Sequence, residues 1–594
     1  MSIESILETK GREALVNLFG ESDTLPGIQL QHTRREFEGD WTIVVFPFLK
    51  LSGKGPEETA RMLGDQLVEM TNEIASYNVV KGFLNLSLKD EFWINEAGHL
   101  ANADWWRGTK KSKSVMVEYS SPNTNKPLHL GHIRNNLLGW SVAEILKANG
   151  YDVKKVNLVN DRGIHICKSM LAWQRWGNNE TPDSVNLKGD KLVGNYYVRF
   201  DQELKKEVAD RIARGIEEKE AEQEAPLMQE AREMLRKWEA GDEEVRKLWA
   251  TMNQWVYDGF EITYQKMGVD FDDTYYESNT YLLGKQKVEE ALKRGELYQK
   301  EDGSVWVDLE ADGLDQKLLL RSDGTSVYMT QDIGTAIQRF ESGHLDQHIY
   351  VVGNEQDYHF KALSLILKKM GYAWAENLYH LSYGMVDLPS GKMKSREGTV
   401  VDADDLIAEV VDTARQKTME LGKVEGLEDD EADQLFYRIG MGALKYFILK
   451  VDPKKKMLFN PEESIDFNGH TGPFIQYTHA RIASVLRKGN EEGLKPWDAS
   501  GLPSALEERE RSLLKILFQF RDIVHEAGKL LSPAMVANYV YDLAKEFNQF
   551  YHECPILKAE DRQQVLWRLS LADAVRNTIN DGMHLLGIEV PDRM

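Results

Sequence analysis

Residues 113–161 decide the expected fold. They read KSVMVEYSS at 113–121, IRNNLLGWSVAEILKANG at 133–150 and DVKKVNLVND at 152–161, with a turn rich in Pro, Asn and Gly after the first stretch. The first and third stretches are short, apolar and β-branched, as in buried strands, while the middle one repeats apolar residues at helical spacing and ends at Gly150. Strand, helix and strand in this order predict an α/β fold with a doubly wound parallel sheet, whose binding site lies at the carboxyl ends of the strands.

The flanking segments extend this prediction. Residues 1–108 read as a separate mixed α/β unit, in which the strand-like WTIVVFPFL and FLNLSL flank a helical PEETARMLGDQLVEMTNEIA. Residues 173–245 are long, charged and helical, which favours an insertion with solvated faces. Further on, SVWVDL, HIYVVGNEQ, FKALSLILKKMGY and LYHLSYGMVDL restore the alternation of strand and helix, which predicts a second half of the same sheet.

These patterns divide the chain into four expected parts. Residues 1–108 form the N-terminal α/β unit, and residues 109–401 form the Rossmann-type domain with insertions at about 173–245 and 276–325. Residues 402–465 form a connecting stem, and the mostly helical residues 466–594 form an all-α domain. Such a multidomain organisation suits a chain of 594 residues, which is longer than one hydrophobic core usually supports.

Composition narrows the class of protein. A chain with 42% hydrophobic and 28% charged residues is expected to be globular. No stretch is apolar enough to span a membrane, and the start MSIESILETK lacks the features of a signal peptide, so we expect a cytosolic protein. Cys167 and Cys554 belong to no cluster with the spacing of metal ligands, which favours reduced thiols over a disulfide or zinc site.

The net charge of −23 weakens the case for a polyanionic partner, because phosphate binding depends on Lys and Arg. A large acidic protein can still carry a local basic face. In HARIASVLRK, the residues Arg481, Arg487 and Lys488 are expected to lie near one another on a helix. The overall charge therefore does not exclude a nucleic acid.

The most specific motif is SSPNTNKPLHLGHIRNN at residues 120–136, at the junction of the first strand and its helix. Free amide groups at a helix N-terminus favour an anion. His129 and His132 can donate hydrogen bonds to phosphate oxygens, and Gly131 allows a nucleotide to approach the backbone. The pattern HxGH also occurs in ordinary turns, so its position at a strand and helix junction is what indicates a nucleotide site.

A second motif, GKMKSREGTVV at 391–401, places Lys392, Lys394 and Arg396 in a loop flanked by glycines. Most such basic runs are simply solvated loops. This one follows a predicted strand, where mobile cations can neutralise a triphosphate as pyrophosphate leaves. The two motifs together indicate a triphosphate site more specifically than either does alone.

The two motifs resemble the signatures of class I aminoacyl-tRNA synthetases, since HLGH is similar to HIGH and GKMKSREG to the KMSKS loop. The strings EYSSPNTNKPLHLGHIRN, NDRG, YMTQDIGTA, VVGNEQDYHF and FNGHTGPFIQYTHARIASVLRK resemble the arginyl-tRNA synthetase family specifically. The resemblance runs from about residue 113 to the final LLGIEVPDRM, and more loosely over the N-terminal unit. It implies that residues 1–108 contact tRNA and that residues 466–594 bind the anticodon.

The resemblance also implies residue roles. The implied catalytic residues are His129, His132, Lys126, Lys392 and Lys394, and ATP binding adds Gly131, Gly353, Glu355, Met393 and Ser395. The implied arginine pocket consists of Glu118, Asn123, Tyr328, Asp332 and Gln356. This set makes chemical sense, because a guanidinium is a planar fork of donors that needs carboxylate and amide acceptors. Without the resemblance, Asp332 would be interpreted as a helix-terminal residue and Tyr328 as a core aromatic.

The implied reaction has two steps. The carboxylate of L-arginine attacks the α-phosphorus of Mg²⁺-ATP, and the adenylate then transfers its acyl group to the 2′-hydroxyl of the terminal adenosine of tRNA(Arg). Positioning and charge stabilisation would drive catalysis. Mg²⁺ would arrive with the nucleotide, and no tightly bound metal or organic cofactor is expected. Candidate tRNA contacts are Gln476, Tyr477, His479 and Arg481, although each is equally compatible with a helical core. A monomer is expected, although the sequence does not determine the oligomeric state.

One departure from the class pattern concerns the KMSKS-like loop. An ungapped match places Ser395 where the class has its second lysine, so one cation is displaced. The resemblance suggests that Lys126, three residues before His129, replaces that charge. Alternatively, Lys394 or Arg396 restores it through a small shift of the loop, and Lys126 is then a solvated turn residue.

Two other functions use the same motifs. A small-molecule nucleotidylyltransferase or amide-forming synthetase can share the HxGH site, but the large insertion and the long helical region disfavour it. A synthetase-like RNA-binding protein without activity is the non-enzymatic alternative. The intact His129, His132 and arginine-pocket set argue against it.

Overall fold

The computed structural model describes residues 3–21, 25–34, 36–387, 401–421, 428–498, 501–559 and 561–594. The chain divides into two compact units. One unit contains Met1–Trp106, Arg481–Phe520 and Asp542–Thr578, and the other contains Arg107–Ala480, Arg521–Tyr541 and Ile579–Met594. Because each unit combines segments that are distant in the sequence, the four-part division by residue number remains a prediction.

The N-terminal part of the first unit is a mixed α/β layer, as predicted. Its four-stranded sheet has the order β1-β2-β4-β3 with antiparallel pairing, and α3 packs on β3 and β4 through Ala60, Leu63 and Leu67. The elements are α1 (Ile3–Phe19), β1 (Leu30–His32), β2 (Trp41–Val44), η1 (Phe46–Phe48), α2 (Leu49–Ser52), α3 (Pro56–Met70), β3 (Ile74–Val80), β4 (Phe83–Leu88), α4 (Asp90–Ala97) and η2 (Gly98–Ala101).

Two predicted elements of this part are wrong in extent. The strand expected over WTIVVFPFL ends at Val44, because Pro47 lies in the first turn of a 3-10 helix and has no amide hydrogen for a sheet. The helix expected over PEETARMLGDQLVEMTNEIA ends at Met70. Thr71 is extended, and β3 begins at Ile74 within the stretch that was assigned to the helix.

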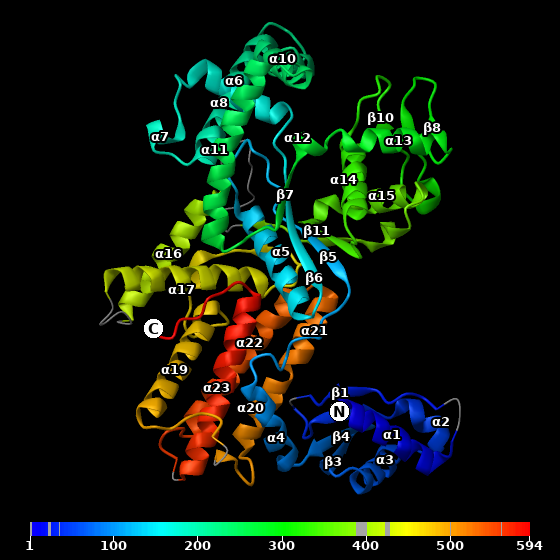
Figure 1. The fold of residues 1–594 in the computed structure, drawn as a ribbon, viewed down its shortest axis with the longest axis vertical. Helices are drawn as coiled ribbons and strands as arrows, with labels where there is room; N and C mark the ends of the chain where they lie inside the picture. Colours follow the sequence, from blue (N-terminus) through cyan, green and yellow to red (C-terminus); the bar gives the residue numbers. More distant parts are fainter. Residues whose placement is uncertain are drawn as a thin grey trace. The chain divides into compact units, whose positions relative to one another are not determined.

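A five-stranded parallel sheet forms the centre of the second unit and confirms the predicted doubly wound fold. Its order is β12-β11-β5-β6-β7, and Figure 1 labels β5, β6, β7 and β11. The strands are β5 (Ser114–Glu118), β6 (Asp152–Val159), β7 (Asp273–Tyr276), β11 (Gln347–Gly353) and β12 (Leu378–Tyr383). Since the order reverses beside β5, the carboxyl ends of β5 and its neighbours define the expected ligand crevice.

The helix that follows β5 is α5 (Leu130–Ala148), and it ends just before Gly150, as predicted. Gly150 has a φ of +86°, a left-handed conformation that favours glycine. The helix is buried on most of its faces, because it contacts β5, β6 and β11 and also α16 and α17. Its N-terminus is therefore held rigidly at the ligand crevice.

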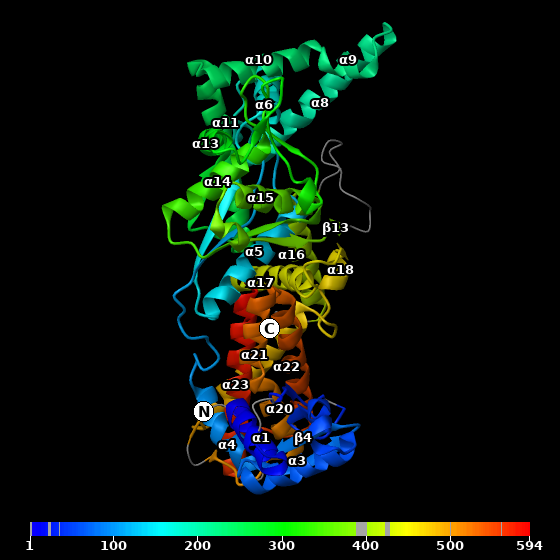
Figure 2. The same ribbon diagram turned by 90° about the vertical axis from the view of Figure 1, so that its right-hand side faces the viewer.

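The first insertion is helical, as predicted, but its faces are not all solvated. Its elements are α6 (Ile164–Trp176), α7 (Pro182–Val185), α8 (Gly189–Ala213), α9 (Glu218–Gln223), α10 (Pro226–Ala240) and α11 (Glu243–Met267). Helices α6, α8, α10 and α11 pack against one another, as two views show (Figure 1, Figure 2). Leu192, Phe200 and Trp238 are buried among them.

The second insertion corrects one strand assignment. SVWVDL contains β9, which belongs to a separate three-stranded antiparallel sheet of order β10-β9-β8 and not to the second half of the main sheet. A turn at Asp302 and Gly303 joins β8 and β9 into a local hairpin. The elements between β7 and β12 are α12 (Glu277–Thr280), α13 (Leu283–Lys293), β8 (Tyr298–Gln299), β9 (Val305–Val307), η3 (Glu310–Asp312), β10 (Lys317–Leu320), α14 (Tyr328–Ser342), β11, η4 (Asn354–Gln356), α15 (Asp357–Lys369) and η5 (Ala373–Asn377).

After residue 402 the described chain is mostly helical, as predicted. The elements that follow β12 are β13 (Val386–Asp387), α16 (Ala403–Glu420), α17 (Asp429–Leu449), β14 (Met457–Leu458), α18 (Pro461–Ser464), α19 (Gly472–Glu491), α20 (Glu508–Phe518), α21 (Phe520–Leu530), α22 (Pro533–Glu553) and α23 (Arg562–Leu585). Within the ranges that the structure describes, no helix is both long and apolar enough to cross a membrane.

Candidate active site

The loop between β5 and α5 is held in a fixed shape by side-chain amides. Ser120 and Ser121 have φ values of +80° and +47°, which turn the chain sharply after β5. The amide of Ser120 donates to Asn135 Oδ1 at 2.5 Å, and the amide of Ser121 donates to Asn157 Oδ1 at 3.0 Å. Asn135 lies in the second turn of α5, so the helix positions its own entry loop.

His129 and His132 form a reciprocal cap at the start of α5. The amide of Gly131 donates to His129 Nδ1, and the amide of His129 donates to His132 Nδ1, each at 3.1 Å. Because both Nδ1 atoms accept, a neutral ring must carry its proton on Nε2. Both histidines therefore keep an Nε2–H donor for a ligand.

The surroundings keep these histidines neutral. Burial, together with the charge of Lys126, lowers the pKa of His129 to about 4. Burial also lowers the pKa of His132 well below its usual value, with smaller contributions from His129 and Lys126. Burial lowers the pKa of Lys126 as well. Lys126 therefore lies close enough to affect both rings, as its predicted role requires.

The structure gives a reason for a glycine at position 131 that the sequence did not indicate. A Cβ atom at this position would lie 3.0 Å from His129 Cε1 and 3.1 Å from His129 Nδ1. A larger residue would thus press on the ring that caps α5. The absence of a side chain therefore preserves the cap.

Arg134 joins the start of α5 to two other segments. Its buried guanidinium donates to five carbonyl oxygens: Gly384 at 2.6 Å, Met385 at 3.4 Å, Asp452 at 3.4 Å, Pro453 at 3.1 Å and Lys455 at 2.9 Å. The predicted ATP-binding residues Lys392, Met393, Lys394 and Ser395 lie outside the described residues. On the far side of that stretch, the amide of Ala403 donates to the carbonyl of Leu128 at 2.9 Å.

Four of the five predicted arginine-pocket residues come from three places: the loop after β5, the start of α14, and η4. Asn123 is exposed after β5, and its backbone forms a bridge with Asn160 after β6. Tyr328 begins α14 and is 77% exposed, so it is not a core aromatic. Asp332 lies one turn further along α14, and Gln356 is exposed in η4 after β11.

A histidine that the sequence did not single out contacts the pocket. His359 Nε2, from α15, lies 2.6 Å from Asp332 Oδ2. This contact links α14 to α15 and orients the Asp332 carboxylate.

Glu118 is not a free charge in the pocket, contrary to its predicted role. It is 5% exposed and forms an ion pair with Arg339 of α14, while His348 Nε2 lies 3.6 Å from its Oε2. Burial alone would raise the pKa of Glu118, but Arg339 and His348 outweigh that effect and lower it. The chain itself already neutralises this carboxylate.

Glu277 is an acidic residue that sequence reasoning missed. It follows β7 directly at the start of α12, where the carboxyl end of a parallel strand meets the crevice. Burial raises the pKa of Glu277 to about 7, with Arg162 opposing the shift and Asp161 and Asp332 adding to it. Its proximity to Asp332 makes it the better candidate for a second pocket charge. Assigning TYY as a third parallel strand would have found it.

Asp161, in the NDRG string, holds the turn that carries Glu277. Its carboxylate accepts from the Ser278 amide at 2.8 Å, the Ser278 hydroxyl at 2.7 Å and the Tyr257 hydroxyl at 2.9 Å. Asp161 is 1% exposed, and burial raises its pKa. Asp161 therefore positions Glu277 through this turn, and its own carboxylate is not available to a substrate.

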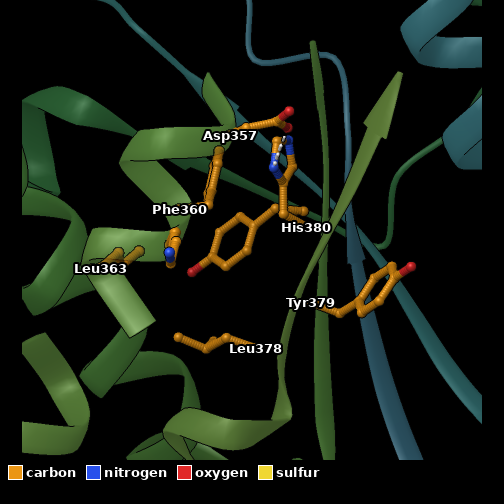
Figure 3. Close-up of a pocket in the computed structure, with 8 residues that line it drawn as sticks. Asp357, Phe360, Leu363, Leu378, Tyr379 and His380 are labelled. Carbon is orange, nitrogen blue, oxygen red and sulfur yellow. Dashed lines mark ion pairs between the residues drawn. The ribbon is translucent and has the colours of Figure 1, made fainter. Parts of the chain in front are cut away.

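Gly353 and Glu355, the other predicted ATP-binding residues, lie at the end of β11. Gly353 is buried, and Glu355 is exposed in η4. Close to them, a cavity of about 210 Å³ opens between α15 and β12 (Figure 3). His380 Nδ1 lies 3.3 Å from Asp357 Oδ1 at this cavity, and His380 Nε2 donates to the carbonyl of Val352 at 3.0 Å. Its lining contains no predicted site residue, so the cavity is separate from the predicted pocket.

Two of the four predicted tRNA contacts are corrected by burial. Gln476 is 0% exposed, and its amide donates to the carbonyls of Arg438 at 2.9 Å and Glu589 at 2.8 Å. His479 is 4% exposed, with its Nδ1 3.0 Å from the carbonyl of Pro591. Both side chains hold the C-terminal segment and cannot stack on a base. Tyr477 and Arg481 are half-buried and remain predictions.

A doubly wound parallel sheet with two histidines at the start of its first helix suits the catalytic domain of a class I aminoacyl-tRNA synthetase, and comparison with known proteins decides between this class and the nucleotidylyltransferases that can share the HxGH site. The family model described as tRNA synthetases class I (R), catalytic domain, matches residues 99–460, and the DALR anticodon binding domain matches residues 475–594. The chain is 57% identical over 597 residues to an arginine–tRNA ligase of Bacteroides fragilis and 54% identical over 600 residues to one of Porphyromonas gingivalis, with 100% of each chain covered. The chain belongs to the arginyl-tRNA synthetase family, which confirms the resemblance seen in its motifs.

Solved structures agree with this assignment. The arginyl-tRNA synthetase of Thermus thermophilus is similar with a TM-score of 0.81 at 26% identity, and 100% of both chains is covered. A methionyl-tRNA synthetase of Mycobacterium tuberculosis shares the fold more distantly, with a TM-score of 0.51 at 12% identity over 81% of this chain and 92% of that one.

Proposed function

We propose that this chain activates L-arginine with ATP and esterifies it to tRNA(Arg), with both steps at the carboxyl edge of the parallel sheet. The observation that carries the proposal is the pairing of opposite chemistries in one crevice. Phosphate donors cluster at the start of α5, and the carboxyl groups of Glu277 and Asp332 lie just after β7 and near the start of α14. An amino acid that is cationic at its side chain and is activated by a polyanionic nucleotide requires both.

In the first step the histidines hold the triphosphate. The Nε2–H groups of His129 and His132 donate to phosphate oxygens, while the dipole of α5, whose N-terminus lies here, adds a favourable field. Lys126 supplies a cation beside them and takes the place of the lysine that the KMSKS-like loop lacks. The family resemblance assigns Lys392, Met393, Lys394 and Ser395 to the same nucleotide, and Gly353 and Glu355 border it at the end of β11.

Arginine recognition uses acceptors with fixed directions. Asp332 and Glu277 receive the planar guanidinium, and Asn123, Gln356 and Tyr328 complete the pocket. Lysine offers a point charge with three donors, so it leaves acceptors unpaired in a partly buried site. We expect it to be rejected strongly.

The partners beyond the small substrates follow from the same family. The helical region 466–594 contacts the anticodon arm, with Tyr477 and Arg481 as candidate contacts, and residues 1–108 add a second tRNA contact. Mg²⁺ enters as part of the ATP substrate, through oxygen ligands of the nucleotide. Within the described ranges, no group of three His, Cys, Asp or Glu side chains suits a resident metal. A cytosolic monomer remains the expectation.

A charging assay with all twenty amino acids and total tRNA tests the proposal. Arginine-dependent aminoacylation that requires tRNA, with lysine charged far more slowly, is the expected result. Product formed without tRNA would favour a small-molecule nucleotidylyltransferase. Absence of both charging and arginine-dependent ATP–pyrophosphate exchange would favour a synthetase-like RNA-binding protein.

A further inference from the structure

A buried charge cluster lies on the sheet beside the proposed arginine pocket. Glu118 ends β5, Arg339 lies on α14 and His348 lies on β11, and they are 5%, 2% and 0% exposed. A guanidinium nitrogen of Arg339 pairs with Glu118 Oε2, and His348 Nε2 approaches the same oxygen at 3.6 Å. Three elements that each have one end at the crevice thus meet at one carboxylate.

The charges within the cluster balance one another without a substrate. Burial and the charge of Arg339 lower the pKa of His348 to about 4, so this ring is neutral, and the guanidinium balances the carboxylate. The guanidinium carbon of Arg339 also lies 4.7 Å from the ring centre of Tyr275 on β7. A substrate guanidinium would have to displace Arg339 before it reached Glu118.

The position of Arg339 along its helix connects this cluster to the pocket. Asp332 and Arg339 are seven residues apart on α14, which places them on the same face, about two turns from each other. Arg339 anchors the far half of α14 to β5, and this contact fixes the rotation and the axial position of the near half. Asp332 and Tyr328 occupy that near half.

A buried ion pair is a poor source of stability, because desolvation offsets its attraction, but it imposes a specific alignment on the elements it joins. One guanidinium nitrogen of Arg339 contacts Glu118, and the ring of Tyr275 lies beside the same guanidinium, so the group is restricted from two sides, whereas apolar packing at the same place would tolerate sliding. This pair is therefore better suited to aligning β5 with α14 than to stabilising the fold.

We propose that Arg339 is a positioning residue for arginine recognition, and that Glu118 acts through Arg339 and not by touching the substrate. The proposal rests on the proposed function only in taking Asp332 as a ligand of the guanidinium. It assigns to Glu118 a different role from the direct contact that the family resemblance implied.

The experiment compares arginine affinity with ATP affinity in four variants of the full chain and one control variant. Glu118→Gln leaves the Arg339 charge buried and unpaired, so the arginine Kd should rise about 30-fold while the ATP Kd changes less than about threefold. In Glu118→Gln/Arg339→Gln, two amides replace the two charges and pair with each other, so about tenfold of that loss should be recovered. A direct substrate contact predicts no recovery, and a double variant as weak as Glu118→Gln would overturn the proposal.

Arg339→Lys is the milder variant and covers the case in which Glu118→Gln does not fold. It should raise the arginine Kd three- to tenfold at unchanged ATP Kd, since a lysine keeps the charge but not the planar geometry. Wild-type arginine affinity in a folded Arg339→Lys would contradict the proposal. Asp332→Asn reports on the pocket itself: if it binds arginine normally, the proposed pocket is wrong, whereas weak binding without recovery in the double variant refutes only the role of Arg339.

Arg568→Gln/Glu510→Gln is the matched control. This pair is also buried, at 3% and 2% exposure with Arg568 Nε 2.9 Å from Glu510 Oε1, and it belongs to the other compact unit. Its removal should lower the melting temperature and leave both dissociation constants within about twofold of wild type. An equal loss of arginine affinity in this control would show that Glu118 and Arg339 matter only for general stability.

Discussion

The nucleotide side and the arginine side of the crevice carry opposite charges, yet burial acts on both in the same sense. On the nucleotide side it lowers the pKa values of Lys126, His129 and His132, which disfavours their cationic forms. On the arginine side it raises the pKa of Glu277, which disfavours its anionic form. Each side is shifted toward neutrality when the crevice is empty.

The contrast lies in what each side gains from its substrate. Under the proposed function, the histidines act as neutral donors, so a phosphate would meet polarised N–H groups and one amine. Glu277 would have to lose a proton to pair fully with a guanidinium, so arginine binding would change its ionisation state. The two sides should therefore respond differently to charge removal, to pH and to isosteric substitution.

The largest effect is expected on the nucleotide side. Lys126→Ala should lower the rate of arginine-dependent ATP–pyrophosphate exchange by about 100- to 1,000-fold, because charge on the developing phosphate oxygens is lost. Fold and tRNA affinity should change little, and Lys126→Arg should retain most of the rate. A near wild-type rate in Lys126→Ala, with collapse in Lys394→Ala, would assign the compensating charge to the KMSKS-like loop.

The next effect tests the arginine side by removing one charge. Asp332→Asn should reduce kcat/KM for arginine by about 30- to 100-fold, since a partly buried charge-assisted hydrogen bond becomes a neutral one. His359 would then face an amide. The ratio of the arginine charging rate to the lysine charging rate should decrease in this variant. Comparable arginine and lysine charging rates in the unmodified protein would contradict the acceptor set as a whole.

The pH dependence sharpens the comparison further. Because burial raises the pKa of Glu277 to about 7, arginine affinity should fall about tenfold between pH 8 and pH 6, as measured by calorimetry. A carboxyl with a raised pKa binds more protons when folded, so its contribution to stability decreases as the pH rises from about 4.5 to 7. Glu277→Gln should remove both dependences. A flat arginine affinity in the wild type would place Glu277 outside the pocket.

The smallest expected effect distinguishes the roles of the two ring nitrogens of His129. Asn keeps an acceptor for the Gly131 amide, whereas Gln keeps a donor near the position of Nε2. His129→Asn should therefore weaken ATP binding about fivefold with little loss of stability, and His129→Gln should show the reverse. The ratio of wild-type to His129→Asn affinity should stay constant from pH 5.5 to pH 8, because the ring is already neutral. A ratio that follows pH would mean that the imidazolium binds ATP.

The fold was predictable where local pattern and tertiary packing agree. The strand, helix and strand around HLGH follow directly from apolar spacing, and the sheet confirmed them. WTIVVFPFL was misjudged because hydrophobicity outweighed the effect of Pro47. SVWVDL is indeed a strand, but alternation alone cannot tell which sheet a strand joins, and a local Asp-Gly turn decided that.

The site was predictable where a motif is contiguous and less so where partners are distant in sequence. Glu118 has the right chemistry for an arginine ligand, but its partner Arg339 is 221 residues away and invisible to any local pattern. The same limit applies to Gln476 and His479, whose acceptors are carbonyls of residues 589 and 591. A polar residue on an amphipathic helix suggests a surface contact until such a partner is known.

The anchor formed by Arg134 has an evolutionary consequence. All five of its acceptors are main-chain carbonyls, and every amino acid supplies one. The side chains around residues 384 and 452–455 can therefore change during evolution while the hydrogen bonds from Arg134 to these segments are kept. By contrast, no replacement in either segment can compensate for a change at Arg134 itself. Among relatives, this arginine should be conserved while the residues that it contacts vary. Methods that detect contacts from correlated substitutions should therefore miss these contacts.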